Sequence, residues 1–229
     1  LHSDSRNFLR FASHNARSLS SSHSFYVDLF TSIKLTAFSV SETWLKSSIP
    51  GKQVELPGYT FFRHDRTYRG KKHGGGVGTY VRKGVKAKII LASDKGCEFE
   101  YLFLELSFNG VKVAFGVIYR PPWSSIPRFV EKFDLVLTEL SSSYARIVIS
   151  GDFNVDINLV SSVSSPLLST IERHSLKIIP SYDTCHTLNG RSTKLDLMLV
   201  SDSKSVSHLY QSSAAGIVVL RLSHTVVLT

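Results

Sequence analysis

The stretch RIVISGDFNVDINLV, residues 146–160, decides how this chain folds. Its first five residues, 146–150, are mostly apolar and β-branched, which predicts a buried strand. Gly151 then allows a tight turn, and Asp152 and Asn154 follow two residues apart. Because side chains alternate along an extended backbone, Asp152 and Asn154 should share one side while Phe153 returns to the core. The stretch therefore predicts a buried strand that presents a polar pair at its end.

Segments with strand or helix periodicity surround this stretch. Strands are predicted at residues 74–84, 100–108, 111–119, 145–150 and 193–201, and residues 35–45 are predicted as a buried strand that runs into a loop at Ser41-Glu42. Helices are predicted at residues 24–34, 124–143 and 165–176. The apolar face of the first helix is predicted to be Phe25, Leu29, Phe30 and Ile33. The apolar face of the second is predicted to be Phe129, Phe133, Val136, Leu137 and Leu140. These elements predict an α/β fold with two packed sheets and helices outside.

The composition restricts the class of protein. The 229 residues are 42% hydrophobic and 20% charged, which suits one large domain or two small ones. The net charge of +9 favours a polyanionic partner, such as nucleic acid, an anionic membrane or a phosphorylated substrate. A basic surface without such a partner is the alternative. No apolar run reaches the roughly 20 residues that span a bilayer. The chain starts without Met, which favours a fragment of a longer polypeptide.

Cysteine spacing and glycine motifs exclude some kinds of site. Cys97 and Cys185 form neither a CxxC pair nor a zinc pattern, so no disulfide framework and no cysteine metal site are predicted. No GxSxG elbow is present, which disfavours a Ser-His-Asp hydrolase. The motif HGGGVG, residues 73–78, leads into a strand and lacks the lysine of a P-loop. It is interpreted as a tight turn rather than a phosphate cradle.

Polar side chains follow or lie within several apolar runs, and these are the candidate site residues. Taken singly, each has an ordinary structural interpretation, such as a turn aspartate or a solvated glutamate. Strand ends that meet at one edge of a packed sheet converge in space, so the set is more informative than its members. Carboxylates, amides and a histidine together suit hydrolysis of a phosphodiester with a hard cation. The set is Asn15, Glu42, Tyr119, Asp152, Asn154, Asp196 and His224.

In order along the chain, these motifs resemble the exonuclease–endonuclease–phosphatase superfamily. The phrases SETWL, GGGVGTYV, VIYRPP, GDFNVD and STKLDLMLV are similar to the AP-endonuclease-like domain of non-LTR (LINE-type, CR1/Jockey-like) retrotransposons. The resemblance implies a DNase I-like, four-layered α/β sandwich over residues 1–229 as a single domain. It also implies a larger polyprotein with a downstream reverse transcriptase.

The resemblance also implies a role for each candidate residue. Glu42 would be the chief ligand of Mg²⁺, or of Mn²⁺, with Asn15 beside it. Asp152 would orient or deprotonate water, and Asn154 would hold that water and the phosphate. Tyr119 would donate a hydrogen bond to the phosphate or the leaving oxygen. These roles agree with the need for a cation and neutral donors around a phosphate that gains negative charge.

The remaining roles concern charge stabilisation and DNA contact. His224 would stabilise charge on the phosphoryl oxygens, with Asp196 fixing its ring. Thr184, or alternatively Thr187, would touch the DNA backbone, and residues 185–193 would form a hairpin that enters the minor groove. Further basic or polar residues are candidate phosphate contacts: Arg17, Arg63, Arg66, Arg69, Lys71, Lys72, Arg120, Arg191 and Thr193. The family usually ends in Ser-Asp-His, whereas this chain has Leu222-Ser223-His224, which predicts weakened cleavage.

The predicted function is a Mg²⁺-dependent endonuclease that nicks one DNA strand. The products would be a 5′-phosphate and a 3′-OH that primes reverse transcription. The isolated domain would be a monomer without a membrane partner, made in the cytoplasm and active in the nucleus. Two alternatives stay open: a superfamily relative that acts on abasic sites or phosphorylated lipids, and a degenerate domain that binds DNA without cutting it.

Overall fold

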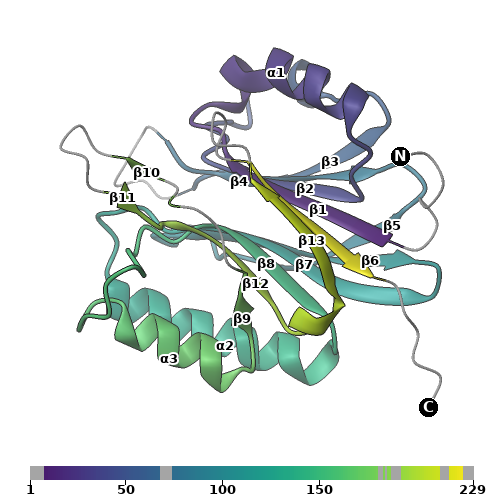
Figure 1. Ribbon diagram of the computed structural model, residues 1–229. Coiled ribbons are helices and arrows are strands. Elements are labelled where there is room, and N and C mark those ends of the chain that lie inside the picture. The colour runs from purple at the N-terminus through teal and green to yellow at the C-terminus, as the bar shows by residue number, and fades with distance from the viewer. Residues whose placement is uncertain are drawn as a thin grey trace.

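Two mixed β-sheets pack face to face, and helices cover both outer faces (Figure 1). The computed structural model describes residues 8–67, 74–179, 183, 185–186, 192–211 and 217–223. This arrangement confirms the predicted four-layered α/β sandwich. Within the described part of the chain, no helix has the length and apolar character needed to cross a membrane.

The first sheet has the strand order β13-β14-β1-β2-β4-β3. Its strands are β1 (Phe8–Asn15), β2 (Ala37–Ser41), β3 (Tyr59–His64), β4 (Val77–Arg82), β13 (Val206–Gln211) and β14 (Val218–Ser223). Helix α1 (Leu19–Ser32) covers the outer face, and its Tyr26 and Phe30 pack against Phe38 of β2. The predicted face of this helix was partly wrong, because Phe25 is 41% exposed and Tyr26 is fully buried.

The second sheet has the strand order β5-β6-β7-β8-β12-β9. Its strands are β5 (Lys86–Ala92), β6 (Glu100–Phe108), β7 (Val111–Tyr119), β8 (Ile147–Asp152), β9 (Lys177–Ile178) and β12 (Asp196–Val200). Helices α2 (Ile126–Ser143) and α3 (Ser165–Arg173) cover its outer face (Figure 1). The five apolar residues predicted for α2 are all buried, which confirms that stripe.

Short elements complete the fold. The 3₁₀ turns are η1 (Gly51–Val54) and η2 (Ser203–Ser205). Strands β10 (Cys185–His186) and β11 (Ser192–Thr193) pair antiparallel, with Cys185 opposite Thr193. The described ends of the predicted 185–193 hairpin therefore pair as expected.

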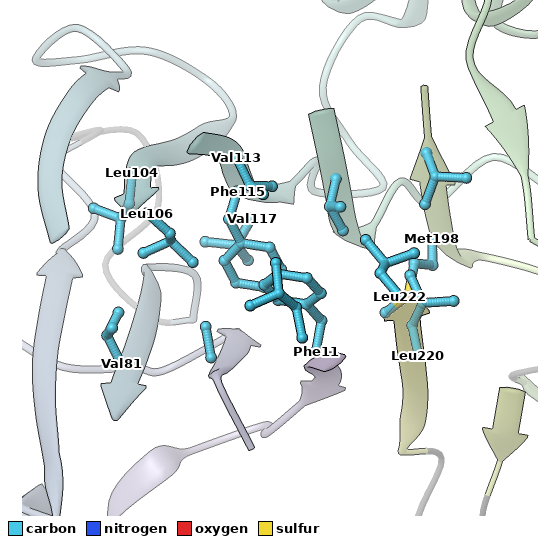
Figure 2. Close-up of a cluster of buried hydrophobic side chains, with 14 of the residues drawn as sticks. Phe11, Val81, Leu104, Leu106, Val113, Phe115, Val117, Met198, Leu220 and Leu222 are labelled. Carbon is cyan, nitrogen blue, oxygen red and sulfur yellow. The ribbon is translucent and has the colours of Figure 1, made fainter. Parts of the chain in front are cut away.

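Between the sheets, the side chains change from apolar to polar along the strands. At one end Phe11 of β1 stacks on Phe115 of β7 with ring centroids 4.8 Å apart (Figure 2). Burying an aromatic side chain of this kind contributes about 1.5–3 kcal/mol. Next along the strands, Ser39 of β2 and Ser150 of β8 join the two sheets by a buried hydrogen bond of 2.6 Å. The polar end beyond this pair is where the candidate site lies.

Candidate active site

Four adjacent strands of the second sheet place polar side chains in one row at this end. Asp196 of β12 is opposite Asp152 of β8, and Asp152 is opposite Tyr119 of β7. Tyr119 is in turn opposite Glu100 of β6. Asp152, Tyr119 and Glu100 are all buried. The row confirms that these strand ends converge, and it adds Glu100, which the sequence did not single out.

Asn15 and Glu42 reach this row from the first sheet. Asn15 ends β1 and lies opposite Ser41, the last residue of β2, so Glu42 follows directly beside it. The Asn15 amide nitrogen donates to Glu42 Oε1 at 2.9 Å and to Asp152 Oδ2 at 2.8 Å. One carboxamide therefore holds two carboxylates that come from different sheets. Glu42 Oε2 also accepts a hydrogen bond of 3.1 Å from the Trp44 indole.

The backbone around Asp152 is fixed by close contacts. Gly151 has φ +140°, and a Cβ there would lie 1.9 Å from the Ile118 carbonyl oxygen on the neighbouring strand. No larger residue fits without displacing that strand. Asp152 Oδ1 accepts from the Asn154 backbone N–H at 2.9 Å, and the Asn154 amide donates to the Arg120 carbonyl at 2.8 Å. Phe153 is fully buried under the helices, as its alternation predicted.

Burial and neighbouring charges shift the protonation of this site. Burial raises the pKa of Asp152 well above its usual range, and Asp196 and Glu42 raise it further, whereas Asn154 and Asn15 lower it by hydrogen bonding. Burial, with the charges of Glu42 and Asp152, also raises the pKa of Tyr119. The Tyr119 hydroxyl therefore keeps its proton at neutral pH and can donate a hydrogen bond. Concentrated negative charge of this kind favours a bound cation.

The donor set fits Mg²⁺ better than a metal held entirely by protein side chains. Glu42 Oε1 and Asp152 Oδ2 accept hydrogen bonds of 2.9 and 2.8 Å from the same Asn15 nitrogen. The distance between these two oxygens therefore cannot exceed the sum of the two bond lengths. Among the described residues, no group of three or more His, Cys, Asp or Glu is arranged around a metal site. Mg²⁺ in proteins commonly takes one or two carboxylates and keeps several waters or substrate oxygens. Glu42 and the Asn15 side chain are the residues that would hold it.

Arg120 does not have the predicted role, and the prediction that it contacts DNA phosphate was wrong. Its side chain is 1% exposed. The guanidinium donates to four backbone carbonyls, those of Pro121, Ser124, Phe153 and Asn154, at 2.6–3.1 Å. Tyr119 faces the space between the sheets, and Arg120, the next residue, points the opposite way. Arg120 therefore joins the segments after β7 and β8 from below the site.

The other predicted DNA contacts divide between described and undescribed positions. Arg17 is exposed, and its backbone N–H donates to Asn15 Oδ1 at 3.2 Å, so its backbone lies beside the site. Thr193 is half-buried in β11. The candidates outside the described residues are Arg69, Lys71, Lys72, Thr184, Thr187 and Arg191. Arg63 instead forms an ion pair with Asp65 at 3.2 Å.

The fold gives no support to the predicted site residues at the carboxyl end of the chain, Ser223 and His224. His224 lies outside the described residues, so its predicted role and that of Asp196 as its partner stay predictions. Ser223 pairs with Phe8, at the opposite end of β1 from Asn15. Seven residue steps along β1 separate those ends, about 23 Å at 3.3 Å each. Ser223 therefore lies at the end of β1 that is far from Asn15 and Glu42.

Comparison with known proteins gives the family context. A family model described as "Endonuclease-reverse transcriptase" matches residues 113–216, a segment from β7 to beyond β13. No curated protein sequence matches the chain.

Solved structures share the fold along nearly the whole chain. The endonuclease domain of TRAS1, a telomere-specific non-LTR retrotransposon, superposes with a TM-score of 0.72 at 11% identity, over 95% of this chain and all of that one. The AP endonuclease LMAP from Leishmania major gives 0.76 at 16% identity, over 97% of this chain and 90% of that one. The 3′ phosphatase NExo from Neisseria, solved with a product DNA hairpin, gives 0.68 at 15% identity, over 94% and 98%. At these identities the comparisons establish the fold, which nucleases and phosphatases share.

Proposed function

We propose, because this chain has the fold of the exonuclease–endonuclease–phosphatase superfamily, that it is a Mg²⁺-dependent DNA endonuclease of a non-LTR retrotransposon. It would nick one strand of duplex DNA and leave a 5′-phosphate and a 3′-OH. The 3′-OH would prime reverse transcription by a downstream domain of the same polyprotein, in the nucleus. Mn²⁺ would be an alternative cofactor, and the isolated domain would act as a monomer.

The observation that carries this proposal is the Asn15 amide that joins the Glu42 and Asp152 carboxylates. It brings a cation-binding carboxylate and a base within reach of one phosphodiester. When bound, Mg²⁺ supplies positive charge for the phosphoryl oxygens. The chain's own groups do the rest: Asp152 orients and deprotonates the attacking water, and the protonated Tyr119 hydroxyl donates to a phosphate oxygen. The charge of +9 attracts the DNA backbone.

A second candidate is a domain that binds DNA but cuts it weakly or not at all. The position of Ser223, paired with Phe8 at the far end of β1, favours this alternative, because Ser223 then takes no part in the proposed site. Glu42 and Asp152 do not depend on that segment. For this reason we place cutting first.

Product analysis on defined duplexes tests the proposal. Labelled plain duplex, the same duplex with one abasic site, and a phosphoinositide are incubated with Mg²⁺ and wild-type protein, beside Glu42→Gln. The expected result is nicked plain duplex whose ends a DNA polymerase extends, and no nick with Glu42→Gln. Glu55→Gln is the control and should nick normally, because Glu55 is an exposed carboxylate that directly follows the 3₁₀ turn η1. Cleavage of abasic duplex alone would contradict the retrotransposon reading and favour a repair enzyme.

A further inference from the structure

A buried ion pair includes Glu100, the last residue of the row, and has no part in the proposed chemistry. The side chains of Arg66 and Glu100 are 7% and 3% exposed. Arg66 donates to both carboxylate oxygens of Glu100: from Nε to Oε1, and from Nη2 to Oε2 at 3.1 Å. This fork-to-fork geometry fixes the guanidinium plane, which a lysine could not do.

The guanidinium of Arg66 contacts the aromatic wall of the site. Its central carbon lies 5.4 Å from the centroid of the Tyr119 ring and 5.9 Å from that of Trp123. Cation–π contacts at this range are favourable, more so when solvent is excluded. Arg66 also hydrogen-bonds to the Tyr119 side chain. The ion pair therefore constrains the phenol that would donate to the phosphate.

The same pair also holds the glycine turn next to Glu42. A Cβ at Gly75 would lie 2.2 Å from the Arg66 guanidinium, and the Gly76 backbone hydrogen-bonds to Glu100. The glycine turn also bonds to the two residues that follow Glu42. Thr43 N–H donates to the Gly76 carbonyl at 3.1 Å, and Trp44 N–H donates to the Gly75 carbonyl at 2.9 Å.

The backbone conformation of Glu42 and Trp44 depends on these restraints. Both residues have positive φ, +51° and +55°, a conformation that is unfavourable for a non-glycine residue and persists only where the surroundings impose it. The Trp44 indole then bonds to the Glu42 carboxylate, as described above. An unbroken chain of contacts thus runs from the Arg66–Glu100 pair to the carboxylate that would bind the cation.

We propose that Arg66 and Glu100 are positioning residues for the active site. The pair holds Tyr119 and, through the turn at Gly75 and Gly76, the Glu42 carboxylate in their working positions. It does not bind DNA phosphate. A buried ion pair is a weak source of stability, so geometry is what this pair supplies. The kinetic test of this proposal rests on the proposed nuclease function. The spectroscopic test requires no assumed function.

The spectroscopic test uses the tryptophans as reporters. The chain has two, Trp44 and Trp123, and both adjoin the pair. In a Trp123→Phe background, metal-free and without DNA, Glu100→Gln should shift the emission of Trp44 and raise its quenching by acrylamide about twofold or more. The matched control is Glu105→Gln, on the same strand β6, whose carboxylate accepts from the Tyr144 hydroxyl at 2.8 Å. Unchanged Trp44 emission in Glu100→Gln would overturn the proposal even if the wild type proved not to be a nuclease.

The kinetic test separates positioning from phosphate binding. Arg66→Lys and Glu100→Gln should each lower kcat about 10–100-fold, since a misplacement of about 1 Å costs roughly that much. The Kd for duplex DNA and its salt dependence should stay within about twofold of wild type. The proposal is overturned if Arg66→Lys weakens DNA binding and lowers the slope of log K against log salt concentration by about 1, while Glu100→Gln leaves kcat and Kd unchanged. Should either variant unfold, the double variant Arg66→Met with Glu100→Leu removes both charges and should fold with the same loss of kcat.

Discussion

Arg120 offers a quantitative test of how the site is supported. Its guanidinium lies beneath the site and donates to the carbonyls of Pro121, Ser124, Phe153 and Asn154. Substitution by methionine keeps much of the side-chain volume but removes every donor. The carbonyls of Ser124, Phe153 and Asn154 would then lose this donor, whereas the Pro121 carbonyl would still accept from the Ser124 side chain and backbone N–H.

The expected loss of stability follows from those contacts. A buried polar group left without its partner costs about 1–3 kcal/mol, so the carbonyls of Ser124, Phe153 and Asn154 correspond to about 3 kcal/mol at the lower bound. This is a large share of the roughly 5–15 kcal/mol that holds a typical domain together. Arg120→Lys keeps one cation with three donors and should lose about half as much, about 1.5 kcal/mol.

Urea unfolding followed by far-UV circular dichroism measures these losses, and a gel shift with duplex DNA measures binding. Arg128→Ala is the control, because its side chain is 78% exposed and pairs with Glu98 only at 3.7 Å; it should stay within about 0.5 kcal/mol of wild type. Folded Arg120 variants should keep wild-type DNA affinity. An Arg120→Lys protein of unchanged stability but weakened DNA binding would refute the buried role and restore the phosphate contact.

Three further outcomes are expected. Gly151→Ala should fail to fold or lose more than about 3 kcal/mol in urea, because its Cβ would meet the Ile118 carbonyl at 1.9 Å; a wild-type midpoint would contradict this. Ser39→Ala and Ser150→Ala should show a coupling of about 1 kcal/mol in a double-mutant cycle, and additive losses would show that their 2.6 Å bond contributes nothing. The raised pKa of Asp152 means that its contribution to the stability of the metal-free protein declines as pH rises from the unfolded value of about 4 toward the folded one. Urea midpoints between pH 5 and 8 should therefore fall more steeply for wild type than for Asp152→Asn, and equal slopes would count against the shift.

Helices and central strands were predictable where periodicity and burial agree. Helix α2 is the clearest case, since its apolar stripe is regular over about three turns and a serine caps its start. The face of α1 was harder, because Phe25 and Tyr26 are adjacent aromatics and periodicity alone does not choose between them. Tyr26 is selected by the fold, since its hydroxyl lies 2.6 Å from His14 Nδ1. The edge strand β5 was not predicted; it has exposed lysines, and none of its residues is buried.

The site was predictable as a set of strand ends but not in its supporting contacts. Glu42 and Asp152 end apolar runs, and the strand pairing brings them together as expected. Arg120 was misjudged because closeness in sequence to a motif does not say which side of the backbone a side chain takes. Glu100 was overlooked because a glutamate before an apolar run looks solvated in sequence. Its burial depends on Arg66, 34 residues away, and on a pairing that no local pattern encodes.

The most direct test of the central claim is nicking of supercoiled plasmid by wild type and Glu42→Ala, each with Mg²⁺ and with excess EDTA. Parallel gel shifts show that both proteins bind DNA. We expect open-circle product only from the wild type with Mg²⁺, with DNA binding retained in Glu42→Ala. Plasmid that stays intact with wild type at every Mg²⁺ and Mn²⁺ concentration, despite binding, would contradict the nuclease and leave a domain that binds DNA without cutting it.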